Sequence, residues 1–484
     1  MSTAYETVIG LEIHCELNTK TKVFCQCSTE FGGDPNTHIC PVCTAMPGTL
    51  PVLNRQAVEK CVTAGLALGC TINRYANMDR KNYFYPDLPK AYQISQLHHP
   101  LCLGGVVEFD YTDEQGKPQR GRVRLNRIHL EEDAGKSLHD AYGKSTLLDF
   151  NRCGVPLIEI VTEPDLRSAE EAGAFVETVR SILQFAGVSD CQMQEGSLRA
   201  DINLSIRPYG GPLGTRTEMK NLNSLKAIVR AAKSEAKRQE ELIEDGKRVI
   251  QETRRWDDSK GRSISMRSKE EANDYRYFPD PDLLPIVLDD QWMEEIRSAL
   301  PEGPGAKRTR YAAEYGLPEY DAGILTTDPD LARFFEDACQ HTGNYKAVSN
   351  LLMGDIMRRV KEDEEAHFAA LPFPPADLAE LVNLIDIGTI NTTTGKAVLE
   401  FMFAKEGAPA AIVEARGLAK ISDDGALRDA AKRVVAANLD AVQGYNAGKD
   451  KAFGFIMGQM MKETRGKADP ETAKRILLEE MKNV

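Results

Sequence analysis

Residues 8–17 alternate between apolar and polar positions. This period of two is typical of a β-strand, in which successive side chains point to opposite faces of a sheet. The apolar face would consist of Ile9, Leu11, Ile13, Cys15 and Leu17, and the polar face of Gly10, Glu12, His14 and Glu16. One face of this strand can therefore join a core, while the other presents side chains of the kind that bind metal ions.

Similar patterns predict further elements in the first 290 residues. Strict alternation over residues 198–207 predicts a second long strand, whose polar row includes Arg199 and Asp201 and faces either solvent or a functional site. The remaining predictions are a hairpin over residues 104–130, a short polar strand over residues 216–223, and helices that begin after Asn54, Ser168 and Ser224. Strands therefore dominate this part of the chain.

Beyond about Trp292 the pattern changes to helical periodicity. A chain of 484 residues is too long for a single core. We expect an α+β protein with a strand-rich domain over residues 1–293, an all-α helical domain over residues 294–409 and a small all-α tail domain over residues 410–484. Basic residues between 449 and 475 form either a surface that grips a nucleic-acid backbone or the solvated face of packed helices.

Charge and composition exclude several classes of protein. A net charge of −13 argues against broad coating of nucleic acid, although it permits a local basic groove. The N-terminal segment lacks the basic and apolar parts of a signal peptide, and no apolar run approaches the roughly 18 residues of a membrane span. We therefore expect a cytoplasmic protein without membrane contact. The 11 cysteines, an odd number, do not suggest a disulfide scaffold.

Four of the cysteines are closely paired. Cys25 and Cys27 form one pair, and Cys40 and Cys43 form the other, around a loop that contains glycine and proline. Two close pairs of thiols at such spacing predict a structural zinc site within residues 25–43. The alternative is a set of buried or redox-active thiols. A closed site with four thiolates would leave no position for substrate, so its role would be to fix the loop.

Three segments rich in Glu and His predict a second metal site. They carry Glu12 with His14, the adjacent Glu131 and Glu132, and Glu159 within an apolar run. A buried carboxylate needs a compensating partner, which is either a cation or a hydrogen-bond donor such as Arg. Carboxylates with an imidazole favour Mg²⁺ or Mn²⁺ and chemistry on phosphates.

The segment of residues 79–93 mixes cations, aromatic rings and prolines. Lys81 or Lys90 would suit phosphates in such a loop, and Tyr83 would suit stacking on a base. The alternative is a solvated turn with a packed aromatic cluster.

Together, these segments resemble the B subunits of bacterial aspartyl/glutamyl-tRNA amidotransferases. The motifs are VIGLEIH (8–14), DRKNYFYPD (79–87), PKAYQISQ (89–96), HLEEDAGK (129–136), PLIEIV (156–161), EGSLRAD (195–201) and KNLNS (220–224). The segments DYRYFP (274–279) and MGQMMK (457–462) extend the resemblance over essentially the whole chain. It implies a catalytic cradle domain, a helical domain and a tail domain that touches tRNA.

The resemblance also implies a reaction and its partners. ATP would phosphorylate the side-chain carboxylate of Glu or Asp attached to a non-matching tRNA, and ammonia would then displace the phosphate. The ammonia would come from an amidase-type A subunit, with a small C subunit completing a heterotrimer. Zinc would be structural, and not required by the chemistry.

Site residues follow from the same resemblance. The residues implied as ligands of Mg²⁺ are Glu12, His14, Glu132 and Glu159, with Glu131 as the alternative to Glu132. The residues implied to bind ATP, substrate or tRNA are Lys81, Tyr83, Lys90, Arg199 and Asp201. Two other functions remain open: a metal-dependent phosphohydrolase or nuclease that uses the same carboxylates on water, and a non-catalytic tRNA-binding scaffold.

Overall fold

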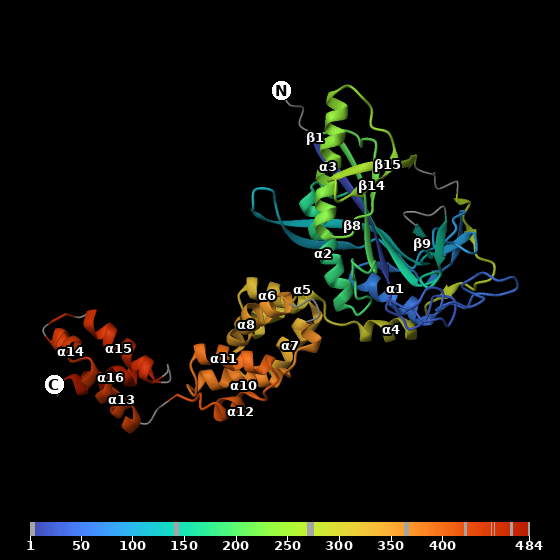
Figure 1. Ribbon diagram of the computed structural model, residues 1–484. Helices are drawn as coiled ribbons and strands as arrows, with labels where there is room; N and C mark the ends of the chain where they lie inside the picture. Colours follow the sequence, from blue (N-terminus) through green and yellow to red (C-terminus); the bar gives the residue numbers. More distant parts are fainter. Residues whose placement is uncertain are drawn as a thin grey trace. The chain divides into compact units, whose positions relative to one another are not determined.

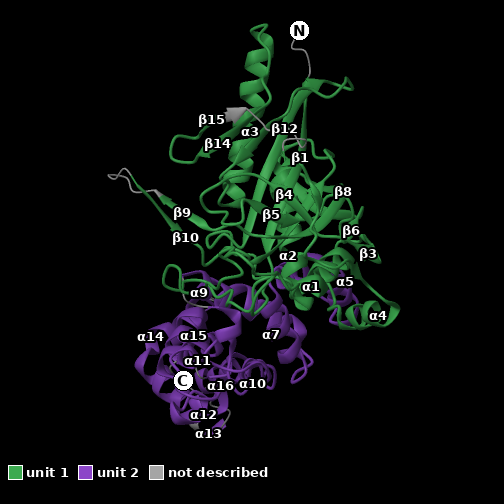
Figure 2. Cartoon of the chain, turned by 90° about the vertical axis from the view of Figure 1, so that its right-hand side faces the viewer, with its two compact units in different colours: residues 1–304 green, residues 305–484 purple. Residues whose placement is uncertain are grey.

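The computed structural model describes residues 5–139, 145–268, 275–362, 367–420, 424–446, 448–449, 451–464 and 468–482. The chain divides into two compact units, residues 1–304 and 305–484 (Figure 2). Strands dominate the first unit and helices the second, which confirms the predicted α+β class. The motif residue Asp274 and the basic tail residues Arg465 and Lys467 lie outside the described residues.

The first unit is built on one large sheet with the strand order β15-β14-β13-β12-β1-β11-β8-β6-β2, and β7 pairs with β8. Neighbouring strands are antiparallel except β13 and β14, which are parallel. The strands are β1 (Tyr5–Glu16), β2 (Thr71–Ile72), β6 (Cys102–Leu103), β7 (Val106–Thr112), β8 (Pro118–Glu132), β11 (Pro156–Thr162), β12 (Leu198–Pro208), β13 (Thr217–Lys220), β14 (Glu252–Asp257) and β15 (Arg262–Ser268).

Shorter strands form three small sheets beside the large one. They are β3 (Tyr75–Ala76) with β17 (Ile286–Val287), β4 (Asp79–Asn82) with β5 (Tyr92–Ser95) and β16 (Phe278–Pro279), and β9 (Lys136–His139) with β10 (Thr146–Asp149). The sheet that contains β4 and β5 contributes side chains to the candidate site described below.

Helices cover the apolar face of the large sheet (Figure 1). They are α1 (Arg55–Ala67), α2 (Ala169–Phe185) and α3 (Leu225–Glu244). Asn54, Ser168 and Ser224 cap them as predicted, because each side chain accepts a hydrogen bond from a backbone N–H in the first turn. The predicted apolar residues of β1 are buried in the same core, so the polar face of β1 points away from the helices.

A fourth helix, α4 (Asp290–Ala299), belongs to this first core, since Met293 and Ile296 are buried in it. The boundary expected at residue 293 therefore falls inside a helix that packs with the first unit. The boundary expected at residue 409 also falls inside a helix, α12 (Pro409–Ala415), whose Ile412 is buried in the core of the helices before it.

The second unit contains two apolar cores. The helices around the first are α5 (Pro304–Glu314), α6 (Glu319–Leu325), α7 (Pro329–Cys339), α8 (Tyr345–Leu351), a π-helical turn (Leu352–Ile356), α9 (Met357–Glu362), a 3-10 turn (Phe368–Ala370), α10 (Pro375–Asp386), α11 (Thr392–Phe403) and α12 (Pro409–Ala415). The helices around the second, which we call the tail module, are α13 (Asp424–Ala437), α14 (Leu439–Asn446), α15 (Lys451–Glu463) and α16 (Pro470–Met481). Within the described ranges, no helix is long and apolar enough to cross a membrane.

Candidate active site

The polar face of β1 forms a row of side chains with the strands beside it. His14 lies opposite Arg199 of β12 on one side and opposite Glu159 of β11 on the other. Glu159 in turn lies opposite His129 of β8. Directly opposed residues of antiparallel strands point to the same face of a sheet. Four strands therefore place Arg199, His14, Glu159 and His129 side by side.

Three side chains of this face converge closely enough to bind one cation. The Nε2 atom of His14 lies 3.5 Å from Oε2 of Glu159 and 3.9 Å from Oε1 of Glu131. One potential ligand atom from each of these three residues lies within 4.8 Å of the others. We call His14, Glu131 and Glu159 the His–Glu cluster.

Two further side chains hold the carboxylates of this cluster in place. The Nε2 atom of His129 lies 3.4 Å from Oε2 of both Glu131 and Glu159. The hydroxyl of Ser95, on β5, donates a hydrogen bond of 3.0 Å to Oε2 of Glu131. The carboxylates are thus held from two sides before any cation binds, which favours a defined site.

Neighbouring charges outweigh burial in the His–Glu cluster. Burial alone would lower the pKa of His14, but the hydrogen bond with Glu159 and the nearby carboxylates raise this pKa to about 9. Burial alone would raise the pKa of Glu159, but the charges of His129, His14 and Lys81 hold it well below its usual value. The pKa of Glu131 is lowered against the effect of burial by its hydrogen bond with His129. Both carboxylates are therefore ionised at neutral pH, the state that binds cations.

The adjacent Glu131 and Glu132 point to opposite faces of β8. The ladder with β11 is regular at these residues, so successive side chains alternate. Glu132 accepts hydrogen bonds from Nζ of Lys90 at 2.7 Å and from the backbone N–H of Ile94 at 2.9 Å. It lines a separate cavity of about 220 Å³, together with Lys90. The geometry therefore selects Glu131, and not the predicted Glu132, as the neighbour of His14 and Glu159.

The predicted ligand Glu12 lies further along the same row. Its carboxylate accepts a hydrogen bond of 3.0 Å from Nδ2 of Asn203, and in the ladder it lies opposite Asp201. Asp201 accepts a hydrogen bond of 2.6 Å from Lys220. A cavity of about 390 Å³ is lined by Glu12, Asn203 and Arg216, among others. Glu12 and Asp201 thus extend the polar row outside the His–Glu cluster itself, and Glu12 borders a space large enough for part of a substrate.

Lys81, on β4, lies among aromatic rings close to the carboxylates. Its ammonium is 4.9 Å from the ring centre of Tyr275 and 5.8 Å from that of Tyr83, distances typical of cation–π contacts. Burial alone would lower the pKa of Lys81, but Tyr277 and the carboxylates Glu131 and Glu159 raise it. Lys81 is therefore charged and oriented, and Tyr83 contributes to its position.

Arg199 supplies a second cation to the row. It forms an ion pair of 2.5 Å with the buried carboxylate of Asp133. Its Nε atom is buried and has no hydrogen-bond partner among the described residues. An unsatisfied buried donor on a guanidinium suits an anionic ligand such as a phosphate.

The donor set of the His–Glu cluster fits a hard divalent cation. Mg²⁺ is usually held by one or two protein carboxylates together with water and substrate phosphates. Glu131 and Glu159 could supply the two carboxylates, and Lys81 and Arg199 are cations of the kind that bind phosphates. Only His14 is an atypical ligand for Mg²⁺, and Mn²⁺ accepts imidazole more readily.

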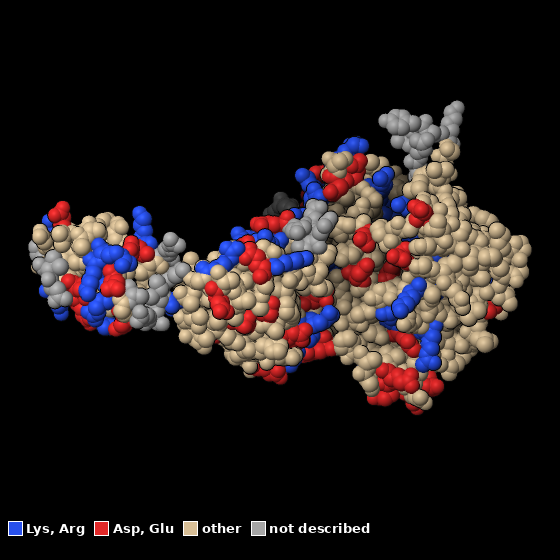
Figure 3. Space-filling view, turned by 60° about the horizontal axis from the view of Figure 1, so that its bottom comes forward, with Lys and Arg blue, Asp and Glu red and all other residues tan. Residues whose placement is uncertain are grey.

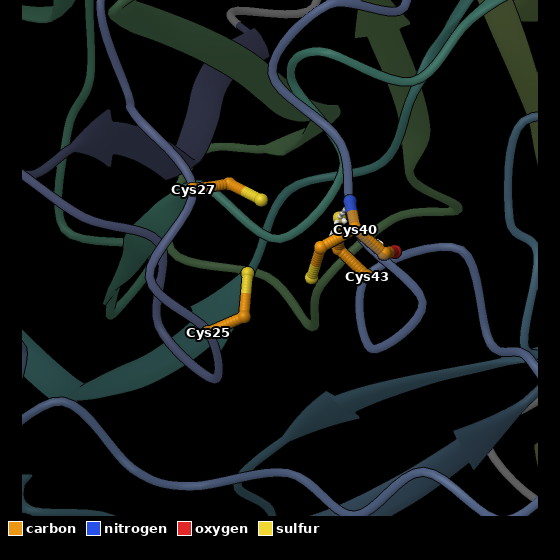
Figure 4. A group of neighbouring side chains, drawn as sticks. All are labelled: Cys25, Cys27, Cys40 and Cys43. Carbon is orange, nitrogen blue, oxygen red and sulfur yellow. Dashed lines mark hydrogen bonds between the residues drawn. The ribbon is translucent and has the colours of Figure 1, made fainter.

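The four predicted cysteines also converge (Figure 4). The thiols of Cys25 and Cys27 point toward the turn that carries Cys40 and Cys43, and all four sulfurs lie within 4.8 Å of one another. A tetrahedral zinc ion with Zn–S bonds of about 2.3 Å needs sulfurs roughly 3.8 Å apart, so small adjustments suffice. This group, which we call the cysteine cluster, could hold a metal ion such as zinc.

Hydrogen bonds already favour a thiolate in the cysteine cluster. The backbone N–H of Cys40 donates to Sγ of Cys43 at 3.2 Å. The pKa of Cys43 is lowered to about 4, chiefly by its hydrogen bond with Cys25, with contributions from the Cys40 backbone and from Lys22 that together outweigh burial. Zinc binds the thiolate form, so the cluster is prepared for a metal.

Comparison with known proteins gives the family. A model of the GatB/GatE catalytic domain matches residues 7–294, and a model of the GatB domain matches residues 333–481. The chain belongs to the GatB family. Relatives named as the B subunit of aspartyl/glutamyl-tRNA(Asn/Gln) amidotransferase include one from Caldicellulosiruptor saccharolyticus, 56% identical over 99% of this chain and 100% of the relative. Another, from Lachnoclostridium phytofermentans, is 55% identical over 98% of both chains.

Membership of the GatB family confirms the resemblance found in the sequence.

No role was predicted for His129, although it lies two residues before Glu131 in one of the motifs. In a strand, residues i and i+2 share a face, so the alternation of β8 could have placed His129 beside Glu131. The signal was missed because the charged Glu132 shares a face of β8 with the apolar Leu130, so the alternation did not decide which face is turned toward the site.

Proposed function

We propose that this chain acts, together with partner subunits, as the part of a GatB-family amidotransferase that activates and amidates amino acids attached to tRNA. The substrates would be Glu-tRNA(Gln) and Asp-tRNA(Asn), as the names of the relatives indicate. The observation that carries the proposal is the convergence of His14, Glu131 and Glu159 beside the charged Lys81.

The chemistry requires activation of the substrate carboxylate, because ammonia does not displace a carboxylate oxygen at neutral pH. An oxygen of the side-chain carboxylate attacks the γ-phosphorus of ATP, and ADP leaves. Ammonia then attacks the resulting acyl phosphate, and inorganic phosphate leaves with formation of the amide. A protein supports such a phosphoryl transfer mainly by positioning the reactants and by stabilising negative charge.

The residues of the site suit these two demands. Glu131 and Glu159 would hold Mg²⁺, and His14 would become a third ligand by giving up its proton as the ion binds. The ion, when bound, would neutralise charge on the phosphates and orient them. Lys81 places a fixed ammonium beside the transferring phosphoryl group, and Tyr275 and Tyr83 hold its direction. Arg199 offers its unpaired Nε to a phosphate or carboxylate oxygen, while Asp133 fixes the guanidinium. Such preorganised cations stabilise the transition state without moving.

The cysteine cluster would hold a structural zinc ion. The cluster lies on a loop that comes before the β7–β8 hairpin and β11 in the chain. Hydrogen bonds join this loop to the segment just before β11. The backbone N–H of His38 donates to Oδ1 of Asn151, and Nδ2 of Asn151 donates to the carbonyl of Asp34. Zinc would therefore support the strand that carries Glu159 and take no part in the reaction.

The tail module would bind tRNA. On the face of the tail module visible in Figure 3, a group of Lys and Arg side chains lies among Asp and Glu side chains. The apolar core of the preceding helices contains or contacts residues up to Leu418, whereas that of the tail module begins at Leu427. Ending the chain after Lys420 should therefore lower tRNA affinity at least tenfold by filter binding, because phosphate contacts are lost, and leave Mg²⁺-dependent chemistry on the bound fraction intact.

A reconstituted assay tests the proposal. We propose that the chain works in the cytoplasm. In the assay it would be combined with an amidase-type A subunit and a small C subunit, and given ATP, glutamine and each misacylated tRNA. Formation of Gln-tRNA(Gln) or Asn-tRNA(Asn) supports the proposal. Hydrolysis of phosphodiesters without tRNA would indicate a nuclease instead. If the Glu159→Gln variant still forms the amide, the chain is a non-catalytic scaffold that binds tRNA.

A further inference from the structure

Lys22 is buried completely beside the cysteine cluster. It lies in the loop between β1 and Cys25, and its exposed fraction is 0%. Its backbone N–H donates to the carbonyl of Cys27 at 3.0 Å, and the next residue, Val23, donates to the carbonyl of Gly154 at 2.9 Å. These two hydrogen bonds hold the backbone at Lys22, and the side chain lies buried beside the cluster.

The partners of this ammonium are unusual for a buried lysine. The Nζ atom lies 3.6 Å from Sγ of Cys43 and donates to the carbonyl of Phe150 at 3.2 Å. Among the described residues no carboxylate lies within 4.0 Å of it. The two acidic side chains that line the same cavity are paired with other cations, Glu132 with Lys90 and Asp282 with Arg80. A buried ammonium costs several kcal/mol unless a negative charge compensates it.

A metal-loaded cysteine cluster supplies this negative charge. Zinc carries two positive charges and four thiolates carry four negative charges, so the loaded cluster has a net charge of about −2. The side of the cluster at Cys43 faces Lys22. Charges or hydrogen bonds next to metal ligands stabilise the loaded state and orient the ligands.

We propose that Lys22 is the built-in counter-charge of the metal-loaded cysteine cluster, so that the fold and a tetrathiolate metal ion stabilise each other. The inference rests on zinc binding by the cysteines, and does not depend on the amidation reaction. It also explains why Lys22 contacts Phe150. Through that carbonyl the lysine joins the cluster to the segment that leads into β11.

Metal affinity of the full-length chain tests the proposal. Co²⁺ would be bound first, because the charge-transfer absorption of cobalt–thiolate bonds reports only the cysteine cluster and not the His–Glu cluster. Zn²⁺ buffered with a chelator would then displace it. Lys22→Met removes charge and donor, Lys22→Gln keeps a donor for Phe150 without charge, and Lys22→Arg keeps the charge. Lys20→Gln, on an exposed residue two positions earlier, is the matched control.

We expect Lys22→Met and Lys22→Gln to lower zinc affinity about 10- to 100-fold, while Lys20→Gln leaves it unchanged and Lys22→Arg retains part of it. The zinc-dependent rise in melting temperature should shrink in the two neutral variants, and their metal-free forms should melt no lower than the wild type. Lys22→Gln with wild-type affinity would overturn the proposal, since the hydrogen bond alone would then matter. A wild-type chain without thiolate bands and without tight zinc binding would overturn the zinc assignment itself.

Discussion

The two candidate metal sites of this chain are built in opposite ways. The cysteine cluster takes all its ligands from one loop of residues 25–43, whereas the His–Glu cluster takes one ligand from each of three strands. Soft thiolates close around an ion and leave no free position, while carboxylates leave room for substrate phosphates. The difference fits the roles that we propose, one site that holds a loop and one that performs chemistry.

The largest effect should distinguish Glu131 from its neighbour. Glu131→Gln should lower ATP cleavage that depends on misacylated tRNA by about 100-fold or more, because a charged group beside the phosphates is lost. Glu132→Gln should lower it less than about tenfold, since Glu132 faces the cavity on the cysteine side. Glu108→Gln, on an exposed residue of β7, serves as the control. Equal losses for Glu131 and Glu132 would mean that the two faces of β8 do not have separate roles.

Removing a cysteine ligand should affect stability and not chemistry. Cys43→Ser should abolish tight zinc binding and lower the free energy of unfolding of the first unit by about 2–5 kcal/mol, the usual range for loss of a metal or crosslink. Urea unfolding followed by tryptophan fluorescence measures this, because Trp256 is buried in that unit. The rate of ATP cleavage per folded molecule should change little. A specific loss of that rate without loss of stability would contradict the division between the two sites.

The aromatic contacts of Lys81 should have a smaller effect. Tyr275→Ala should raise KM for ATP about fivefold, because a cation–π contact contributes roughly 1 kcal/mol. Tyr275→Phe keeps the ring and should behave as the wild type. Steady-state kinetics over a range of ATP concentrations measure the change. If the phenylalanine variant is as impaired as the alanine variant, the hydroxyl, and not the ring, is what matters.

The link between the two sites should have only a small effect on ATP cleavage. Asn151→Ala removes the hydrogen bonds with His38 and Asp34, and should cost about 1–2 kcal/mol of stability. ATP cleavage should fall less than threefold, since β11 is also held by β1 and β8. A loss as large as that of Glu131→Gln would show that the loop controls the site directly.

The cysteine cluster could be predicted from spacing because its ligands are neighbours in the chain. The alternation of β1 likewise predicted which of its residues are buried, and the caps of α1 to α3 were predicted from single residues. These features depend on local geometry alone, and each needs only a few consecutive residues.

The His–Glu cluster could be predicted only in part because it depends on register. Glu12 and His14 share a face of β1, so both were expected as ligands, but only His14 lies opposite Glu159. The choice between Glu131 and Glu132 required the pairing of β8 with β11. A sequence shows which residues alternate on a strand, but it does not show the register in which that strand pairs with its neighbour.

The ladder between β8 and β11 is regular from Arg127 to Glu132, and this limits how the gene can vary. Deleting one codon between the residues for Arg127 and Leu130 would shift the strand by a single step and exchange the directions of Glu131 and Glu132. Glu131 would then face Lys90, and Glu132 would take its place beside His14. Among related genes, we therefore expect insertions and deletions in the turn at residues 112–116, whereas selection should remove them from β8, the strand that follows this turn.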